Sequence, residues 1–189
     1  MTTTKENLDT QLDRGDWFET FTGRQFYPLH PSADDVCIED IAHALSQLCR
    51  FGGHCIEPYS IAQHSVLVSR LCKEQPLQGL LHDATEAFGI NDCVRPAKRY
   101  LPDYKKMEHG IWLCVAEKFG LPAAMHPEVH HADNVTLMTE RRDVCNATPY
   151  KWGLEDQFRP LDDQIVVWNS KEAEANFLAE FYKLQKQIK

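Results

Sequence analysis

Residues 76–88 read PLQGLLHDATEAF, and they combine a helix start with three residues suited to chemistry. Pro76 fits the first turn of a helix, where a missing N–H costs nothing. The segment therefore predicts a helix that carries the adjacent pair His82 and Asp83, with Glu86 one turn later. Neighbouring side chains on a helix project about 100° apart. His82 and Asp83 can both reach one ion only from a helix flank or end that faces a cavity.

Helical patterns lie on both sides of this segment. Before it, residues 34–50 repeat apolar side chains at helical spacing and stop at Gly52 and Gly53. A second helix is predicted from Ser60, which forms a capping box with Gln63, to about residue 73. After the segment, helices are predicted over residues 103–119, over residues 127–146 and, capped by Ser170, over residues 170–189. The last of these carries an apolar stripe that consists of Ala173, Phe177, Phe181, Leu184 and Ile188.

The remaining segments are predicted to be irregular. They are residues 1–25, residues 89–102, which contain two prolines, and residues 146–169, in which residues 165–168 suit a short turn or strand. Strand signals are otherwise nearly absent. Since 189 residues suit about one domain, we expect a single all-α bundle of about six main helices over residues 1–189.

Composition narrows the function. The formal net charge of −8 argues against binding to polymeric nucleic acid or to an anionic membrane. The longest apolar run, residues 110–116, is too short to span a bilayer, and residues 1–16 show no secretory signal, so we expect a cytoplasmic protein. Seven cysteines without a C-x-x-C pair indicate reduced thiols and no zinc knuckle.

Two more residues complete a possible metal site. His64 lies on the predicted helix before the His82-Asp83 pair, and Asp133 lies on a later one. Two imidazoles and two carboxylates suit one divalent cation and leave positions open for water and substrate. Each residue also has a plainer interpretation: an exposed helix turn for the pair, a packed polar residue for His64 and a surface charge for Asp133. Residues 140–143, ERRD, suit surface ion pairs.

Beyond these residues, the chain resembles the HD-domain metal-dependent phosphohydrolases, whose pattern is H, then HD, then D on separate helices. The likeness is strongest to the branch with small bacterial 5′-deoxynucleotidases and phage deoxynucleoside triphosphohydrolases. It rests on TGRQF (22–26), IEDIAHALSQLCRFGGH (38–54), YSIAQHS (59–65), HDATEA (82–87), ADNVTLMTERRDV (132–144) and FLAEF (177–181).

The resemblance implies a role for each matching residue. His64, His82, Asp83 and Asp133 would bind the metal, and Glu86 would orient or deprotonate the attacking water. For the substrate, Arg50 would reach phosphate or sugar, Phe51 would pack on the deoxyribose, Asp92 would touch the sugar and Lys98 a phosphate, with Arg95 or Arg99 as alternative phosphate ligands. His54 and His131 would support the centre from outside. One or two divalent ions (Co, Mn, Zn, Ni or Mg) are expected, with His109 and His130 as candidates for the second.

The expected reaction is hydrolysis of the 5′-phosphate ester of a small deoxynucleotide, with a monophosphate favoured as substrate. A triphosphohydrolase that releases triphosphate is the alternative. A di-iron oxygenase on the same fold and an inert nucleotide-binding module are further possibilities. The resemblance also implies a homodimer.

Overall fold

The computed structural model describes residues 14–91 and 93–187 and confirms the all-α prediction. Its α-helices are α2 (Ile38–Gln47), α3 (Ile61–Leu71), α4 (Pro76–Leu81), α5 (Arg95–Lys98), α6 (Pro102–Phe119), α7 (Pro127–Asp143) and α8 (Ser170–Gln185). Three 3-10 turns accompany them: η1 (Ala33–Asp35), η2 (Arg50–Gly53) and η3 (Ala84–Phe88). The described sheet has two short antiparallel strands, β1 (Phe18–Glu19) and β2 (Gln25–Phe26).

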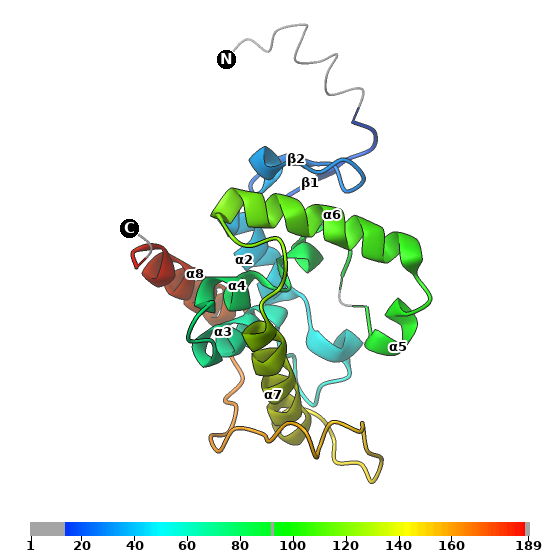
Figure 1. The fold of residues 1–189 in the computed structure, drawn as a ribbon, viewed down its shortest axis with the longest axis vertical. Coiled ribbons are helices and arrows are strands. Elements are labelled where there is room, and N and C mark those ends of the chain that lie inside the picture. Colours follow the sequence, from blue (N-terminus) through cyan, green and yellow to red (C-terminus); the bar gives the residue numbers. More distant parts are fainter. Residues whose placement is uncertain (1–13, 92, 188–189) are drawn as a thin grey trace, which may run out of the picture.

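Helices α2, α3, α4 and α8 pack around a common apolar core, as Figure 1 shows. Helix α6 crosses over one end of this group, and α7 lies against α3 and α4. The fully buried members of the core include Ile41, Leu45, Ile61, Leu80 and Phe177. The predicted stripe of α8 faces this core, although Ile188 lies outside the described residues.

The predicted helix over residues 34–50 is shorter than expected. It ends at Gln47, and Arg50 belongs to the separate turn η2. The reason is an alternative set of backbone partners: the Arg50 N–H donates to the Tyr59 carbonyl (2.9 Å), and the Leu48 carbonyl accepts from the Ile61 N–H (3.1 Å). Pairing with residues 59–61 replaces a further helical turn.

The predicted helix over residues 76–88 is broken at His82 and Asp83. Helix α4 ends at Leu81, and η3 begins at Ala84. A continuing α-helix offers the Gly79 carbonyl to the amide of residue 83. In this structure the His82 side chain donates to the Gly79 carbonyl through Nδ1, at 2.8 Å. The His-Asp pair therefore lies at a helix end, one of the two placements that the sequence allowed.

Two predicted helix starts have different partners from those expected. Ser60 caps α3 by accepting from the Gln63 N–H (3.1 Å), but the Gln63 side chain does not complete the box. It binds the Val166 carbonyl and the Trp168 N–H instead, each at 2.8 Å. Residues 165–168 form no strand and are held against α3 by this amide. Helix α8 is capped by Asn169 rather than Ser170, in a capping box with Glu172.

Smaller differences concern the segments predicted as irregular. Within residues 14–25, a hairpin is fixed to α2 because Asp40 accepts from the Thr22 N–H (2.7 Å) and the Thr20 hydroxyl (3.0 Å). Residues 89–102 contain the short helix α5, and the helix predicted over residues 127–146 ends at Asp143.

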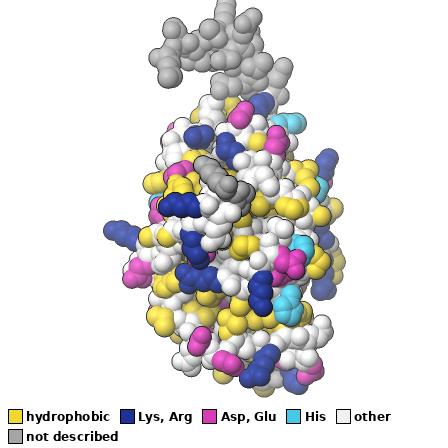
Figure 2. Space-filling model, turned by 60° about the vertical axis from the view of Figure 1, so that its left-hand side comes forward, with side chains coloured by type: hydrophobic (Ala, Val, Ile, Leu, Met, Phe, Trp, Pro, Cys, Tyr) yellow, Lys and Arg dark blue, Asp and Glu magenta, His cyan; other side chains and the backbone are white. Residues whose placement is uncertain are grey.

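The free thiols and the mixed surface agree with the composition of the sequence. All seven cysteines are free thiols, as predicted. On the face shown in Figure 2, Lys and Arg side chains lie among acidic, hydrophobic and uncharged ones. None of the described helices has the length and apolar character needed to cross a membrane.

Candidate metal centre

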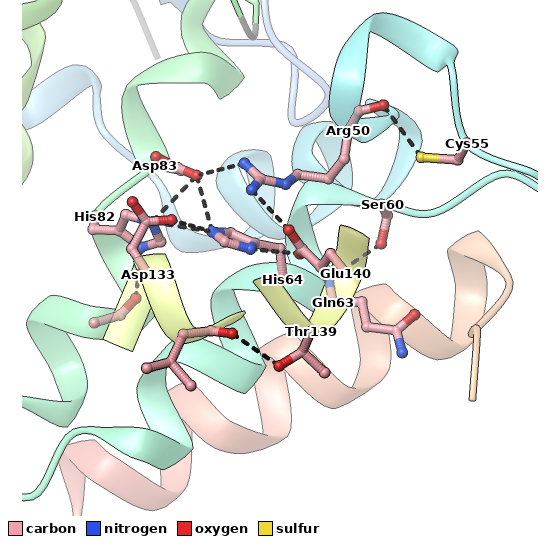
Figure 3. Close-up of polar contacts among 12 residues, drawn as sticks. Arg50, Cys55, Ser60, Gln63, His64, His82, Asp83, Asp133, Thr139 and Glu140 are labelled. Atoms are coloured by element: carbon pink, nitrogen blue, oxygen red, sulfur yellow. Dashed lines mark hydrogen bonds and ion pairs between the residues drawn. The ribbon is translucent and has the colours of Figure 1, made fainter. Parts of the chain in front are cut away.

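Three of the four predicted metal ligands converge at the end of α4 (Figure 3). Their donor atoms lie within 4.8 Å of one another. His64 Nε2, from α3, is 3.3 Å from His82 Nε2 and 3.6 Å from Asp83 Oδ2. His82 Nε2 is 3.3 Å from the same Asp83 oxygen. Two imidazoles and a carboxylate thus surround one point.

The fourth predicted ligand comes from α7. Asp133 Oδ1 lies 3.3 Å from His64 Nε2. Figure 3 shows the Asp133 carboxylate beside the His82 and His64 rings. The other oxygen of Asp133 accepts from Arg95 of α5 at 3.0 Å. Helix α3, the end of α4 and the more distant helix α7 therefore contribute the four candidate donors.

The orientation of both imidazoles fits a bound cation. His64 Nδ1 lies 2.7 Å from Glu140 Oε1, and His82 Nδ1 lies 2.8 Å from the Gly79 carbonyl. A neutral ring that donates from Nδ1 presents a lone pair at Nε2, the usual arrangement of a metal-ligating histidine. Because a metal–ligand bond is about 2.0–2.2 Å, neighbouring ligands of a tetrahedral site lie about 3.3–3.6 Å apart. The observed separations of 3.3–3.6 Å agree with that range.

Charge interactions at the centre shift the pKa of its residues. Burial acts to raise the pKa of Asp83 and Asp133, but contacts with His82 and His64 outweigh it and lower both far below the usual range. Burial and the Arg50 charge lower the pKa of His64, whereas Glu140 and Asp133 together raise it to about 9. A proton and a divalent cation therefore compete for the His64 ring.

Glu140 is the residue that the sequence interpretation missed. We expected it to form a surface ion pair, but its side chain is fully buried and accepts from both His64 Nδ1 and Arg50 (3.0 Å). The surface-pair prediction holds for Arg142 and Asp143 (2.7 Å). One signal for Glu140 was available: it follows Asp133 by seven residues, which places both on one face of a helix.

A cavity of about 320 Å³ opens beside the centre. His82, Asp83 and Asp133 form part of its wall. The other polar lining residues include Lys98, Lys105, Glu108, His109 and His130. Lys98 forms an ion pair with Glu108. Cationic side chains and the candidate centre therefore face the same space.

No protein-family model matches the sequence. The chain is 47% identical over 129 residues to the uncharacterized protein YfdR of Escherichia coli K12, an alignment that covers 68% of this chain and 72% of YfdR. The chain belongs to the YfdR family. It is also 33% identical over 144 residues to an uncharacterized protein of Rhodobacter capsulatus, with 68% of this chain and 73% of that protein covered.

The substrate-binding residues expected for this YfdR-family chain have mixed placements. Arg50 is buried, and it lies between Glu140 and Asp83, with Nη1 3.6 Å from Asp83 Oδ2. Phe51 lies beside its guanidinium, 5.3 Å from Cζ to the ring centroid. Lys98 lines the cavity, whereas Asp92 lies outside the described residues.

Glu86, His54 and His131 differ in their relation to the centre. Glu86 is buried in η3, and its N–H donates to the Asp83 carbonyl (3.0 Å). His54 is exposed after η2, and His131 packs on the Phe158 ring at 5.6 Å. Among residues 14–91 and 93–187 of this YfdR relative, no second group of three metal-ligating side chains converges as closely.

Proposed function

We propose that this chain is an HD-type metal-dependent phosphohydrolase that hydrolyses the 5′-phosphate ester of small deoxynucleotides, with monophosphates as preferred substrates. The observation that carries the proposal is the convergence of His64, His82 and Asp83, with Asp133 in contact with His64, beside a cavity lined by lysines. The order of these residues along the chain, H, HD and D on separate elements, supports the HD type.

The side chains divide the work as follows. His64, His82, Asp83 and Asp133 would hold a divalent cation, which would lower the pKa of water and neutralise charge on a phosphoryl group. Lys98 and Lys105 attract the phosphate into the cavity. Glu86 takes the proton of the attacking water, a role for a carboxylate that does not bind the cation itself. By accepting from His64 Nδ1, Glu140 fixes the orientation of the His64 ring.

The size of the cavity favours monophosphates. At about 320 Å³ it is near the lower end of ligand pockets, which run from about 300 to 1,000 Å³. The carboxylate of Glu108 in the wall also disfavours a long chain of phosphates. A triphosphohydrolase remains the second candidate. Two lysines face the cavity, which is more positive charge than the binding of a single phosphate requires.

A nucleotide panel tests the proposal. Deoxynucleoside mono-, di- and triphosphates are incubated with Co, Mn, Zn, Ni or Mg, and the released phosphate species are identified. We expect inorganic phosphate from monophosphates; release of triphosphate would favour the second candidate. No hydrolysis with any of these metals rejects both, and turnover that requires oxygen would indicate the oxygenase instead.

Two substitutions separate metal binding from chemistry. We expect Asp83→Ala to lose both metal and turnover, since it removes a ligand. We expect Glu86→Gln to keep the metal and lose about 100-fold or more in kcat, since it removes the proposed base. Metal content and kcat are measured on the same preparations. Full activity in both variants would reject the assignment.

A further inference from the structure

Phe51 has a backbone conformation that is unusual for a bulky residue. Its φ is 55°, and it has the one positive φ outside glycine in the described part of the chain. Gly52 and Gly53 follow with φ of 59° and 85°. Strained backbone of this kind persists where the surroundings fix it, and it is frequent at binding sites. The contacts of the Phe51 ring therefore bear on the function of this turn.

On one side, the ring of Phe51 is close to the candidate centre. Arg50 Cζ lies 5.3 Å from the ring centroid, and Arg50 Nη1 lies 3.6 Å from Asp83 Oδ2. Arg50 thus contacts both the Phe51 ring and a candidate metal ligand, and Figure 3 shows its guanidinium beside Asp83. The Phe51 ring is therefore one side chain away from the centre at which we propose the phosphate to bind.

On the other side, Phe51 faces Trp152. The two ring centroids are 6.1 Å apart, with the planes tilted by 41°. Trp152 belongs to the long connection between α7 and α8, at the end of the molecule below α7 in Figure 1. Its ring is 44% exposed, so burial alone does not explain its position.

Specific contacts fix Trp152 where it is. Arg141 Cζ stacks over the indole, 4.6 Å from the ring centroid. The Glu155 carboxylate accepts from the N–H groups of Trp152 (2.8 Å), Gly153 (2.8 Å) and Leu154 (3.0 Å). These contacts hold the indole in place while the residue keeps substantial exposure to solvent.

We propose that Phe51 and Trp152 form a binding site for the planar base of the nucleotide, with Trp152 as a specificity-determining residue. This inference rests on the proposed function, and it adds Trp152, which lies outside the motifs behind that proposal. Stacking on aromatic rings is tolerant of base identity because every base has a π face. The site should therefore accept all bases and bind the larger purines more tightly.

The test compares a substrate with a base and one without. Hydrolysis of deoxyadenosine 5′-monophosphate and of 2-deoxyribose 5-phosphate is measured for the wild type and Trp152→Ala. We expect KM for the nucleotide to rise about tenfold or more with kcat little changed, since stacking is lost. KM for the sugar phosphate should not change. Trp152→Phe should restore most of the nucleotide affinity.

Tyr150→Ala is the matched control, because this aromatic residue of the same connection is 78% exposed; it should leave both KM values unchanged. An equal change for both substrates in Trp152→Ala, or no change for the nucleotide, overturns the base site. Tryptophan fluorescence quenching by the nucleotide gives a second readout that is independent of turnover. Equal quenching in wild type and Trp152→Ala overturns the base site alone, whereas absent hydrolysis with the quenching difference retained overturns only the phosphohydrolase.

Discussion

At the level of single residues, the Glu140 carboxylate positions the His64 ring and the Arg50 guanidinium beside the candidate centre. Its two oxygens bind His64 Nδ1 and the Arg50 guanidinium, and none of the three side chains has more than slight exposure. Removing one partner of such a buried set leaves the others uncompensated. The carboxylate is therefore needed both for stability and for the geometry of the His64 ring.

The substitution Glu140→Gln tests this role. An amide keeps the size of the side chain but weakens its hydrogen bond to His64 and removes the charge that balances Arg50. We expect metal affinity to fall by about 10–100-fold, measured by calorimetric titration with Co or Mn. Glu172→Gln makes the same chemical change in the capping box of α8, and it should leave affinity unaltered because Gln also caps. Equal affinity in both variants would contradict the role of Glu140.

The His64 ring predicts how the stability of the metal-free protein changes with pH. Its pKa of about 9 in the folded protein exceeds the ordinary histidine value of 6.5. Protonated His64 therefore stabilises the metal-free protein fully below about pH 6.5, and this contribution is lost as the pH rises through about 9. By the size of the shift it amounts to about 3 kcal/mol at most.

Urea unfolding of metal-free protein between pH 6 and pH 10 checks this prediction, with His64→Gln as the comparison. We expect the wild type to lose more stability than the variant across this range. Metal-saturated wild type should lack the extra slope, because a bound cation replaces the proton. Parallel pH profiles for metal-free wild type and variant would refute the assignment.

At the level of helices, the contact between α3 and α4 positions His82. A Cβ added to Gly79 would lie 2.9 Å from Cys72 Sγ and 3.2 Å from Ser69 Cα. The Gly79 carbonyl also accepts from His82 Nδ1. The close approach of the two helices and the orientation of a metal ligand thus depend on one residue without a side chain.

We expect Gly79→Ala to destabilise the protein by about 1–3 kcal/mol, because the added methyl overpacks the helix contact. Metal affinity should fall as well, since His82 moves with its acceptor. Gly110→Ala in α6 is the control: its added Cβ would have its nearest contact at 4.0 Å from Pro31. This change should stabilise by up to about 1 kcal/mol through helix propensity. Urea unfolding measures both, and effects of the same sign would contradict the packing argument.

The elements differ in how far the sequence predicts them. Helix α6 begins and ends close to the predicted residues and α8 begins at the predicted one, because the signals are local, such as Gly120 with φ of 67°; α8 ends earlier than predicted, at Gln185. The early end of α2 depends on backbone partners at residues 59–61, and the break at His82 accompanies a side-chain donor to the Gly79 carbonyl; propensity encodes neither. Three predicted ligands converge and the fourth, Asp133, contacts His64, whereas buried Glu140 was hidden within a charged run that resembles a surface.

At the level of the whole molecule, metal binding should stabilise the fold. A ligand that binds only the folded state adds stability that grows with its concentration, about 2.7 kcal/mol at 100 times Kd. We expect the Tm to rise when Co or Mn is added to metal-free wild type and to fall again with a chelator, as seen by thermal denaturation. Asp83→Ala should show neither shift. A metal-induced rise of equal size in that variant would place the binding elsewhere.

The charge of the molecule is distributed unevenly with respect to its cavity. The chain carries a net charge of −8, yet Lys98 and Lys105 face the cavity and Arg95 contacts Asp133 at its edge. We therefore expect the net charge to disfavour polymeric anions. The cations around the cavity should still accept one small anion as substrate.

The distribution of the four donors also has a consequence for synthesis of the chain. His64, His82 and Asp83 are translated well before Asp133, and Glu140 comes later still. A nascent chain that has released only α3 and α4 from the ribosome carries two imidazoles and one carboxylate without the helix that completes and orients them. Because metal ligands distant in sequence come together through folding, loading of the cation should follow the emergence and docking of α7.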